Sequence, residues 1–138
     1  YAGSGALGFE AASRGARSVL MVEKDIKAIK ALRTNKELIK ADNIQLMQRM
    51  ALDVLNDKRK QTDALFDVVF LDPPFKQGEL SECVKRLEES GCLSDDSVIY
   101  LECENALNLD FLPKNWTEHR QKKTGQVAYY LYHREAND

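Results

Sequence analysis

Short apolar runs rich in β-branched residues alternate with helical stretches, and this alternation constrains the fold more than any other feature of the chain. Residues 18–23, 43–48, 68–71 and 97–103 have the length and composition of strands. Between the first two, residues 25–38 repeat their apolar side chains at helical spacing, after an aspartate suited to cap a helix. The pattern predicts an α/β fold built on a mostly parallel sheet.

Three further helices are expected, over residues 10–14, 51–58 and 78–90, the last ending at Gly91 as a C-terminal cap. The strand 68–71 is apolar throughout, which predicts that both of its faces are buried in the middle of a parallel sheet.

The end of the chain departs from this alternation. Residues 117–123 and 126–133 are two strand-like runs on either side of Gly125, with no room for a helix between them. Strands joined by so short a turn must be antiparallel. We therefore expect an antiparallel hairpin at one edge of the sheet.

Size and composition indicate one soluble globular domain over residues 1–138, because 43% of the residues are hydrophobic and 30% are charged. No apolar stretch has the length of a transmembrane helix, and the first residues do not resemble a signal peptide. A cytoplasmic location and a monomeric state are the expectations. The cysteines Cys83, Cys92 and Cys103 lack CxxC spacing, so we predict reduced thiols and no metal site.

The net charge of −2 is not that of a general nucleic-acid binder, which usually has an excess of Lys and Arg. Basic clusters occur at residues 58–60 and 120–123. The first is interpreted as solvated surface. For the second, which adjoins a predicted sheet end, a solvated surface and a polynucleotide contact are both open. Contacts with a polynucleotide must be local or lie outside this chain.

The chain begins with a glycine turn, Gly3-Ser4-Gly5-Ala6-Leu7-Gly8. The first glycine permits a tight turn, the second allows backbone to approach a ligand, and the third allows the next helix to pack closely. The turn predicts a nucleotide-cofactor loop, with a simple packing turn as the alternative. Because a strand normally precedes such a turn, we expect that this chain is the N-terminally truncated part of a longer protein.

Two acidic residues follow later strands. Glu23 ends the strand after the glycine turn, where a carboxylate can accept hydrogen bonds from both hydroxyls of a ribose. Asp53 follows the next strand, where it can accept from an adenine amine. The alternatives are a surface glutamate beside Lys24 and a helix cap for residues 54–58.

The tetrad Asp72-Pro73-Pro74-Phe75, directly after the strand 68–71, is the most specific signal. Two prolines restrict the backbone, so the Asp72 carboxylate and the Pro73 carbonyl can converge on one NH2 group, while Phe75 offers a face for a base to stack on. An amine held in this way can attack an electrophilic methyl carbon. The alternative is an ordinary strand-to-loop turn with a core phenylalanine.

Together, residues 1–10, 13–16, 22–25, 71–75 and 125–127 resemble the bacterial small-subunit ribosomal RNA guanine-N2 methyltransferases of the RsmD type. The resemblance implies a class I, Rossmann-like methyltransferase fold with an antiparallel C-terminal strand and with its first strand missing from this chain. It implies S-adenosylmethionine as the methyl donor, and a guanine of 16S rRNA, within a 30S particle or an assembly intermediate, as the acceptor.

The same resemblance assigns residues to the site. The cofactor-binding residues would be Gly3, Ser4, Gly5 and Ala6 at the methionine moiety, Glu23 with Lys24 beside it at the ribose, Asp53 at the adenine, and Asp72 at the border with the acceptor. The catalytic residues that hold the target base would be Asp72, Pro73, Pro74 and Phe75.

Other functions remain open from the residues alone. An adenine-N6 methyltransferase acting on DNA or RNA shares the constraint on an NH2 group, and a protein-glutamine methyltransferase is disfavoured by Asp72, where such enzymes commonly have Asn. A nicotinamide-dependent oxidoreductase shares the glycine turn and Glu23 but leaves residues 72–75 unexplained. A non-catalytic binding module on this fold is the last alternative.

Overall fold

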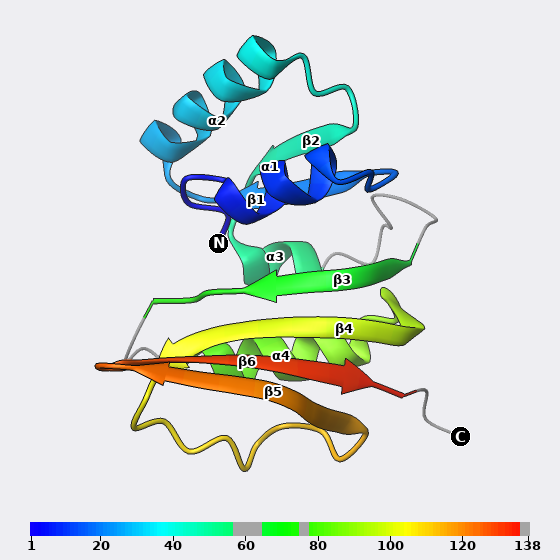
Figure 1. Ribbon diagram of the computed structural model, residues 1–138, viewed down its shortest axis with the longest axis vertical. Helices are drawn as coiled ribbons and strands as arrows, with labels where there is room; N and C mark the ends of the chain where they lie inside the picture. Colours follow the sequence, from blue (N-terminus) through cyan, green and yellow to red (C-terminus); the bar gives the residue numbers. More distant parts are fainter. Residues whose placement is uncertain (57–64, 75–77, 136–138) are drawn as a thin grey trace. The chain divides into compact units, whose positions relative to one another are not determined.

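The computed structural model describes residues 1–56, 65–74 and 78–135 (Figure 1). They divide into two compact units, Tyr1–Val54 and Leu55–Asp138. In chain order the elements are α1 (Ala6–Ser13), β1 (Val19–Glu23), α2 (Ile26–Ile39), β2 (Ile44–Gln48), α3 (Ala51–Asn56), β3 (Phe66–Leu71), α4 (Glu79–Glu89), β4 (Leu93–Glu104), β5 (Trp116–Thr124) and β6 (Val127–Arg134). The alternating order predicted from the sequence is confirmed.

The first unit is built on two parallel strands. β1 pairs with β2 from Val19 opposite Ile44 to Glu23 opposite Gln48, and α2 connects them. Two parallel neighbouring strands need a long connection, and α2 provides it here. Its core consists of buried side chains from β1, α2 and β2: Met21, Ile29, Leu32 and Ile44.

The helix α2 begins and ends where its sequence predicts. The Asp25 carboxylate accepts a hydrogen bond from the Ala28 backbone N–H at 3.1 Å, so the aspartate is the N-cap. Ile29 and Leu32 are buried, and they share the face that the periodicity predicts. The helix ends at Lys40, which has a left-handed conformation with φ of 54°.

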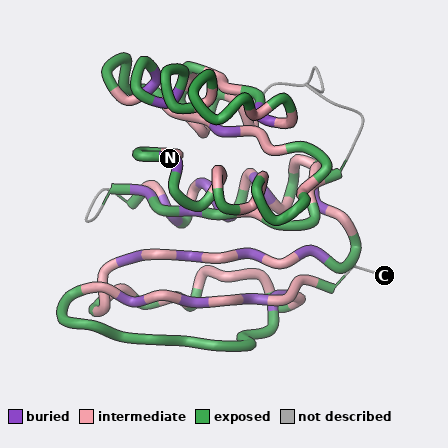
Figure 2. Tube along the Cα trace, turned by 45° about the horizontal axis from the view of Figure 1, so that its top comes forward, coloured by how far each residue is buried: buried purple, intermediate pink, exposed green. Residues whose placement is uncertain are grey.

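The second unit is a four-stranded sheet in the order β3-β4-β6-β5. β3 is parallel to β4, whereas β6 is antiparallel to both β4 and β5. The predicted antiparallel hairpin at a sheet edge is therefore confirmed. Buried residues alternate with more exposed ones along β4 and β6 (Figure 2). This period of two is that of a sheet covered on one face.

The helix α4 supplies the buried layer on that face. Its buried residues Leu80, Cys83, Val84 and Leu87 recur at helical spacing. They complement the buried residues of β4 and β6, which include Ile99, Leu101, Cys103, Ala128, Tyr130 and Tyr132. Trp116 at the start of β5 is also only 5% exposed.

The expectation that β3 is buried on both faces is wrong. Val68 and Phe70 are 52% and 39% exposed. Within the described part of this unit, β3 has a hydrogen-bonded neighbour on one side only, and α4 covers one face of the sheet. The apolar composition of 68–71 therefore does not show where the strand lies in the sheet.

The bounds of two other elements differ by a few residues from those predicted. α1 extends over Ala6–Ser13 rather than 10–14, and β4 begins at Leu93 rather than 97. The last residues predicted for the helix 51–58 lie outside the described part of the chain, as does the basic cluster 58–60. No helix in the described ranges is long and apolar enough to cross a membrane.

Candidate functional site

The first unit carries the glycine turn before α1. Gly3 and Gly5 have φ angles of 55° and 81°, a left-handed backbone that glycine adopts without a steric cost. The Gly5 N–H donates to the Ala2 carbonyl at 2.9 Å, which closes the turn. Ser4 and Ala6 are exposed on either side of the buried Gly5. The turn thus presents backbone at the N-terminus of a helix, where anionic groups are favoured.

Two of the glycines are also required by packing. A Cβ atom on Gly5 would lie 2.5 Å from Leu32 Cδ2, and one on Gly8 would collide with the Met21 side chain. The predicted role of the third glycine, close approach of the helix, is confirmed at Gly8.

We expect Gly5→Ala to destabilise the first unit by about 1–3 kcal/mol, because the methyl group meets Leu32 and Phe9 while alanine is strained at this φ. Gly15→Ala is the matched control, since Gly15 has a φ of 99° but nothing within 4 Å of its Cβ position. Urea unfolding measures both. An equal loss for both variants would show that backbone strain alone, without packing, explains the effect.

Glu23 links the glycine turn to the start of α2. Its Oε1 accepts from the Gly3 N–H at 2.8 Å, and its Oε2 accepts from the Asp25 N–H at 2.9 Å. Burial acts to raise the pKa of Glu23, but the hydrogen bonds from Asp25 and Gly3 outweigh it, so the pKa is lowered. Each carboxylate oxygen keeps a second lone pair for a ligand. The ionised side chain therefore organises the turn and remains an acceptor.

Lys24 and Asp53 lie at the same end of β1 and β2 as the turn. Lys24 directly follows β1 and is exposed, and Asp53 is exposed in the first turn of α3. The alternative in which Asp53 caps a helix is wrong, because α3 already begins at Ala51.

In the second unit, Asp72, Pro73 and Pro74 follow the end of β3. Pro73 is buried, whereas Asp72 and Pro74 are exposed. Phe75 lies outside the described residues. The tetrad therefore begins with a carboxylate directed to the surface and anchored by a buried proline.

Asp72 has a partner that sequence reasoning missed. β3 and β4 are paired so that Leu71 lies opposite Leu101, which places Asp72 beside Glu102 on the next row. The two side chains are neighbours, and hydrogen bonding to Asp72, desolvation of Glu102 and the charge of Asp72 raise the pKa of Glu102 to about 7. The signal that could have located Glu102 is the end of a second parallel strand, but the register is not readable from one sequence.

An aromatic row adjoins this carboxyl pair. Tyr100 lies 5.9 Å from Phe70 in an edge-on arrangement and 6.3 Å from Tyr129, between ring centroids. Burial raises the pKa of Tyr100, and the nearby Glu102, Tyr129 and Asp72 raise it further. These three aromatic rings therefore form a row next to the Asp72 and Glu102 side chains.

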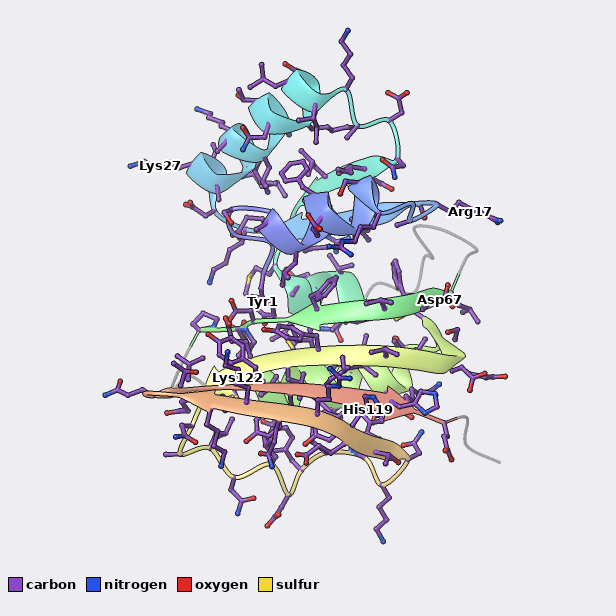
Figure 3. All side chains as sticks on the ribbon, viewed as in Figure 1. Tyr1, Arg17, Lys27, Asp67, His119 and Lys122 are labelled. Atoms are coloured by element: carbon purple, nitrogen blue, oxygen red, sulfur yellow. The ribbon has the colours of Figure 1, made fainter. Side chains whose placement is uncertain are left out.

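The register places a lysine in the row of the carboxyl pair. Tyr129 on β6 lies between Glu102 on β4 and Lys122 on β5. Figure 3 shows Lys122 on β5 toward the side of the sheet at which β3 ends, with His119 farther from that side. The cluster 120–123 is exposed throughout. It lies in the rows of β4 that include Tyr100 and Glu102.

A cavity of about 160 Å³ lies behind the tetrad. Its wall combines Pro73 and Pro74, the first turn of α4, and the loop after β4, and the residues that line it include Glu79, Leu80, Ser81, Cys103, Leu107 and Phe111. It is smaller than the 300–1,000 Å³ or so of a typical ligand pocket, and therefore of a size for one small group. Sequence reasoning missed it because the loop after β4 carries no recognisable motif.

The predicted site residues therefore fall into two sets. In the first unit the structure brings Gly3 and Glu23 into direct contact, and Ser4, Gly5 and Ala6 belong to the same turn. In the second unit it places Asp72 next to Glu102, and Pro73 lines the cavity with Cys103. Among the described residues, no group of three His, Cys, Asp or Glu side chains is arranged to hold a metal ion.

Comparisons with known proteins agree with this arrangement. The model of the family Conserved hypothetical protein 95 matches residues 1–133. The chain is 42% identical to Ribosomal RNA small subunit methyltransferase D of Escherichia coli K12 over 136 residues, which is 99% of this chain and 67% of that protein. The protein of the same name from Haemophilus influenzae is 39% identical, over 96% of this chain and 68% of that protein.

A solved structure shows the same fold. The chain superimposes on a putative methyltransferase, yhhF, from Escherichia coli with a TM-score of 0.89 and 41% identity, over 99% of this chain and 73% of that one. The parallel strands with antiparallel C-terminal strands are therefore those of a Rossmann-like methyltransferase fold.

Proposed function

The chain belongs to the ribosomal RNA small subunit methyltransferase D (RsmD) family, and we propose that it transfers a methyl group from S-adenosylmethionine to the exocyclic N2 amine of a guanine in 16S rRNA. The observation that supports this most directly is the exposed Asp72 carboxylate at the end of β3, anchored by the buried Pro73 and next to Glu102 on β4.

The first unit would bind the cofactor. When bound, S-adenosylmethionine supplies an electrophilic methyl carbon on a sulfonium centre. The exposed backbone of the glycine turn and the ionised Glu23 fit its polar groups, because the turn offers N–H donors and the carboxylate accepts from hydroxyls. The residues we assign to the cofactor are Gly3, Ser4, Gly5, Ala6, Glu23, Lys24, Asp53 and Asp72.

The second unit would hold the amine. The Asp72 carboxylate and the Pro73 carbonyl would accept the two hydrogens of the amine, and Pro74 and Phe75 would complete the base site. The cofactor, when bound, would supply an electrophilic methyl group for the amine nitrogen, and the proton that the amine loses would pass to solvent. Positioning supplies most of the acceleration, so no strong base is needed.

We propose further that residues 1–138 act as one catalytic domain, monomeric and cytoplasmic, on a 30S particle or an assembly intermediate. The supporting facts are the family membership and the match of both units to one methyltransferase structure.

Methyl transfer from labelled S-adenosylmethionine to 30S particles from cells that lack the enzyme tests the proposal. We expect the label in RNA. Label in ribosomal protein, or binding of NAD instead of S-adenosylmethionine in a calorimetric titration, would contradict it.

Replacing Glu23 is expected to weaken cofactor binding first. In Glu23→Gln the amide nitrogen cannot accept a backbone N–H, so one of the two contacts with Gly3 and Asp25 is lost along with the charge. We expect the Kd for S-adenosylmethionine to rise about 10- to 100-fold, as for a lost hydrogen bond to a charged group. Calorimetry measures it.

The matched control is Glu10→Gln, whose exposed carboxylate pairs with Arg14 on α1. Its Kd should stay near that of the wild type. If Glu23→Gln also binds normally while turnover falls, Glu23 does not serve the cofactor.

A further inference from the structure

Glu102 occupies a position that no part of the proposed reaction yet uses. It lies on β4, one row beyond the pairing of Leu71 with Leu101, directly beside Asp72. It also lies opposite Tyr129 of β6, so its side chain shares a face with that ring and with Tyr100. Two acidic residues therefore meet at the end of adjacent parallel strands, where the amine would be held.

A direct hydrogen bond between two carboxyl groups requires a proton, because two carboxylates are acceptors only. The strand register places Glu102 next to Asp72, where such a bond can form. When this bond is formed, Glu102 keeps its proton and donates it in a hydrogen bond to the Asp72 carboxylate.

We propose that Glu102 is the positioning residue of Asp72: protonated, it donates a hydrogen bond to one oxygen of the Asp72 carboxylate and holds the other oxygen toward the target amine. This inference rests on the proposed function and deepens it. Glu102 keeps its proton through the transfer, and the proton released by the amine still goes to solvent.

Ionisation of Glu102 would remove this arrangement. Without this proton the pair consists of two adjacent like charges, which repel each other, and the orientation of Asp72 is no longer fixed. Displacement of a catalytic group by about 1 Å can reduce the rate about 100-fold. The raised pKa of Glu102, about 7, places this change near neutral pH.

Among the described residues, titratable groups face Glu102 from the end of β3 and from β4, β5 and β6. They are Asp72 from the end of β3, Tyr100 and Glu104 on its own strand, Tyr129 on β6 and Lys122 beyond it on β5. Burial raises the pKa values of Tyr100 and of Cys103, which points to the opposite face, so both remain neutral near pH 7. A change of protonation near pH 7 in this row is therefore assigned to Glu102.

The test compares kcat of the whole protein as wild type, Glu102→Gln and Glu102→Ala between about pH 5.5 and about pH 8.5. We expect the wild-type kcat to fall as the pH rises through about 7, because Glu102 then loses its proton. Glu102→Gln should match the wild type at low pH and show no fall, since the amide is a permanent donor. Glu102→Ala should have a kcat about 10- to 100-fold below that of the wild type at low pH, where Glu102 is protonated, without a change in KM for S-adenosylmethionine.

Asp96→Asn is the matched control, because Asp96 lies on the same strand and its side chain is 89% exposed. It should reproduce the wild-type profile. Circular dichroism checks that each variant is folded, and Glu102→Gln decides the outcome even where Glu102→Ala is unfolded.

Three results would overturn the inference. They are a fall in kcat that persists in Glu102→Gln, a Glu102→Gln variant slower than wild type at low pH, or a wild-type kcat that rises with pH as expected for a base. In each case wild-type transfer to RNA would leave the proposed function intact. Absence of wild-type transfer would instead refute the proposed function itself.

Discussion

Replacing Asp72 with alanine is expected to lower kcat about 100- to 1,000-fold, with the Kd for S-adenosylmethionine near that of the wild type. The carboxylate is exposed at the end of β3, and although it lies at the border with the donor, its main proposed role is to hold the acceptor amine. Its loss would also leave Glu102 without the partner that raises its pKa. Single-turnover kinetics and calorimetry separate the two effects.

Asp67→Ala is the control for this prediction. Asp67 is an exposed aspartate on the same strand, at the opposite end of β3 from Asp72. Its kcat should be close to the wild-type value. If Asp72→Ala instead loses cofactor affinity and turnover equally, Asp72 serves mainly the cofactor.

Replacing Glu88 with alanine is expected to destabilise the protein by about 3 kcal/mol, as for breaking a buried ion pair by removal of one partner. The Glu88 carboxylate on α4 accepts from Arg134 Nε at 2.8 Å, Trp116 Nε1 at 2.9 Å and Asn115 Nδ2 at 3.0 Å. The side chains of Arg134 and Glu88 are only 12% and 14% exposed. The Glu88 carboxylate thus connects α4 to the start of β5 and to the end of β6.

The effect depends on pH in a definite direction. Burial acts to raise the pKa of Glu88, but hydrogen bonds from Arg134, Trp116 and Asn115 outweigh it, so the pKa lies below its ordinary value of 4.5. The stabilisation is therefore full above the unfolded-state pKa and is lost as the pH falls through the folded-state pKa. The difference in urea midpoint between wild type and Glu88→Ala should shrink on acidification.

Glu82→Ala is the matched control on the same helix. Glu82 pairs with Arg86 four residues on, and both side chains are about a third or more exposed, at 43% and 32%. Such a pair contributes about 0.5 kcal/mol. A loss as small as this in Glu88→Ala would show that the network around Glu88 does not stabilise the fold.

The sequence was most informative where local chemistry determines structure. The aspartate cap of α2, the glycine turn and the hairpin at Gly125 depend on residues close in sequence, and each was located from them. The start of β4 was predicted too late, because Asp95 and Asp96 interrupt its apolar pattern and aspartate rarely occurs in strands.

Features that depend on distant residues could not be predicted in this way. Glu102 meets Asp72 only because two strands pair in one particular register, and Glu88 meets Arg134 across 46 residues. The exposure of Val68 and Phe70 likewise depends on which faces other elements cover. The site therefore contained a recognisable carboxylate and a partner for it that one sequence cannot reveal.

The central claim is most directly tested by identifying the methylated nucleoside. The protein is incubated with labelled S-adenosylmethionine and 30S particles from cells lacking the enzyme, and the RNA is digested to nucleosides. Our account predicts label in N2-methylguanosine. Label in N6-methyladenosine would contradict it, because Asp72 and Pro73 would then hold the amine of adenine rather than that of guanine.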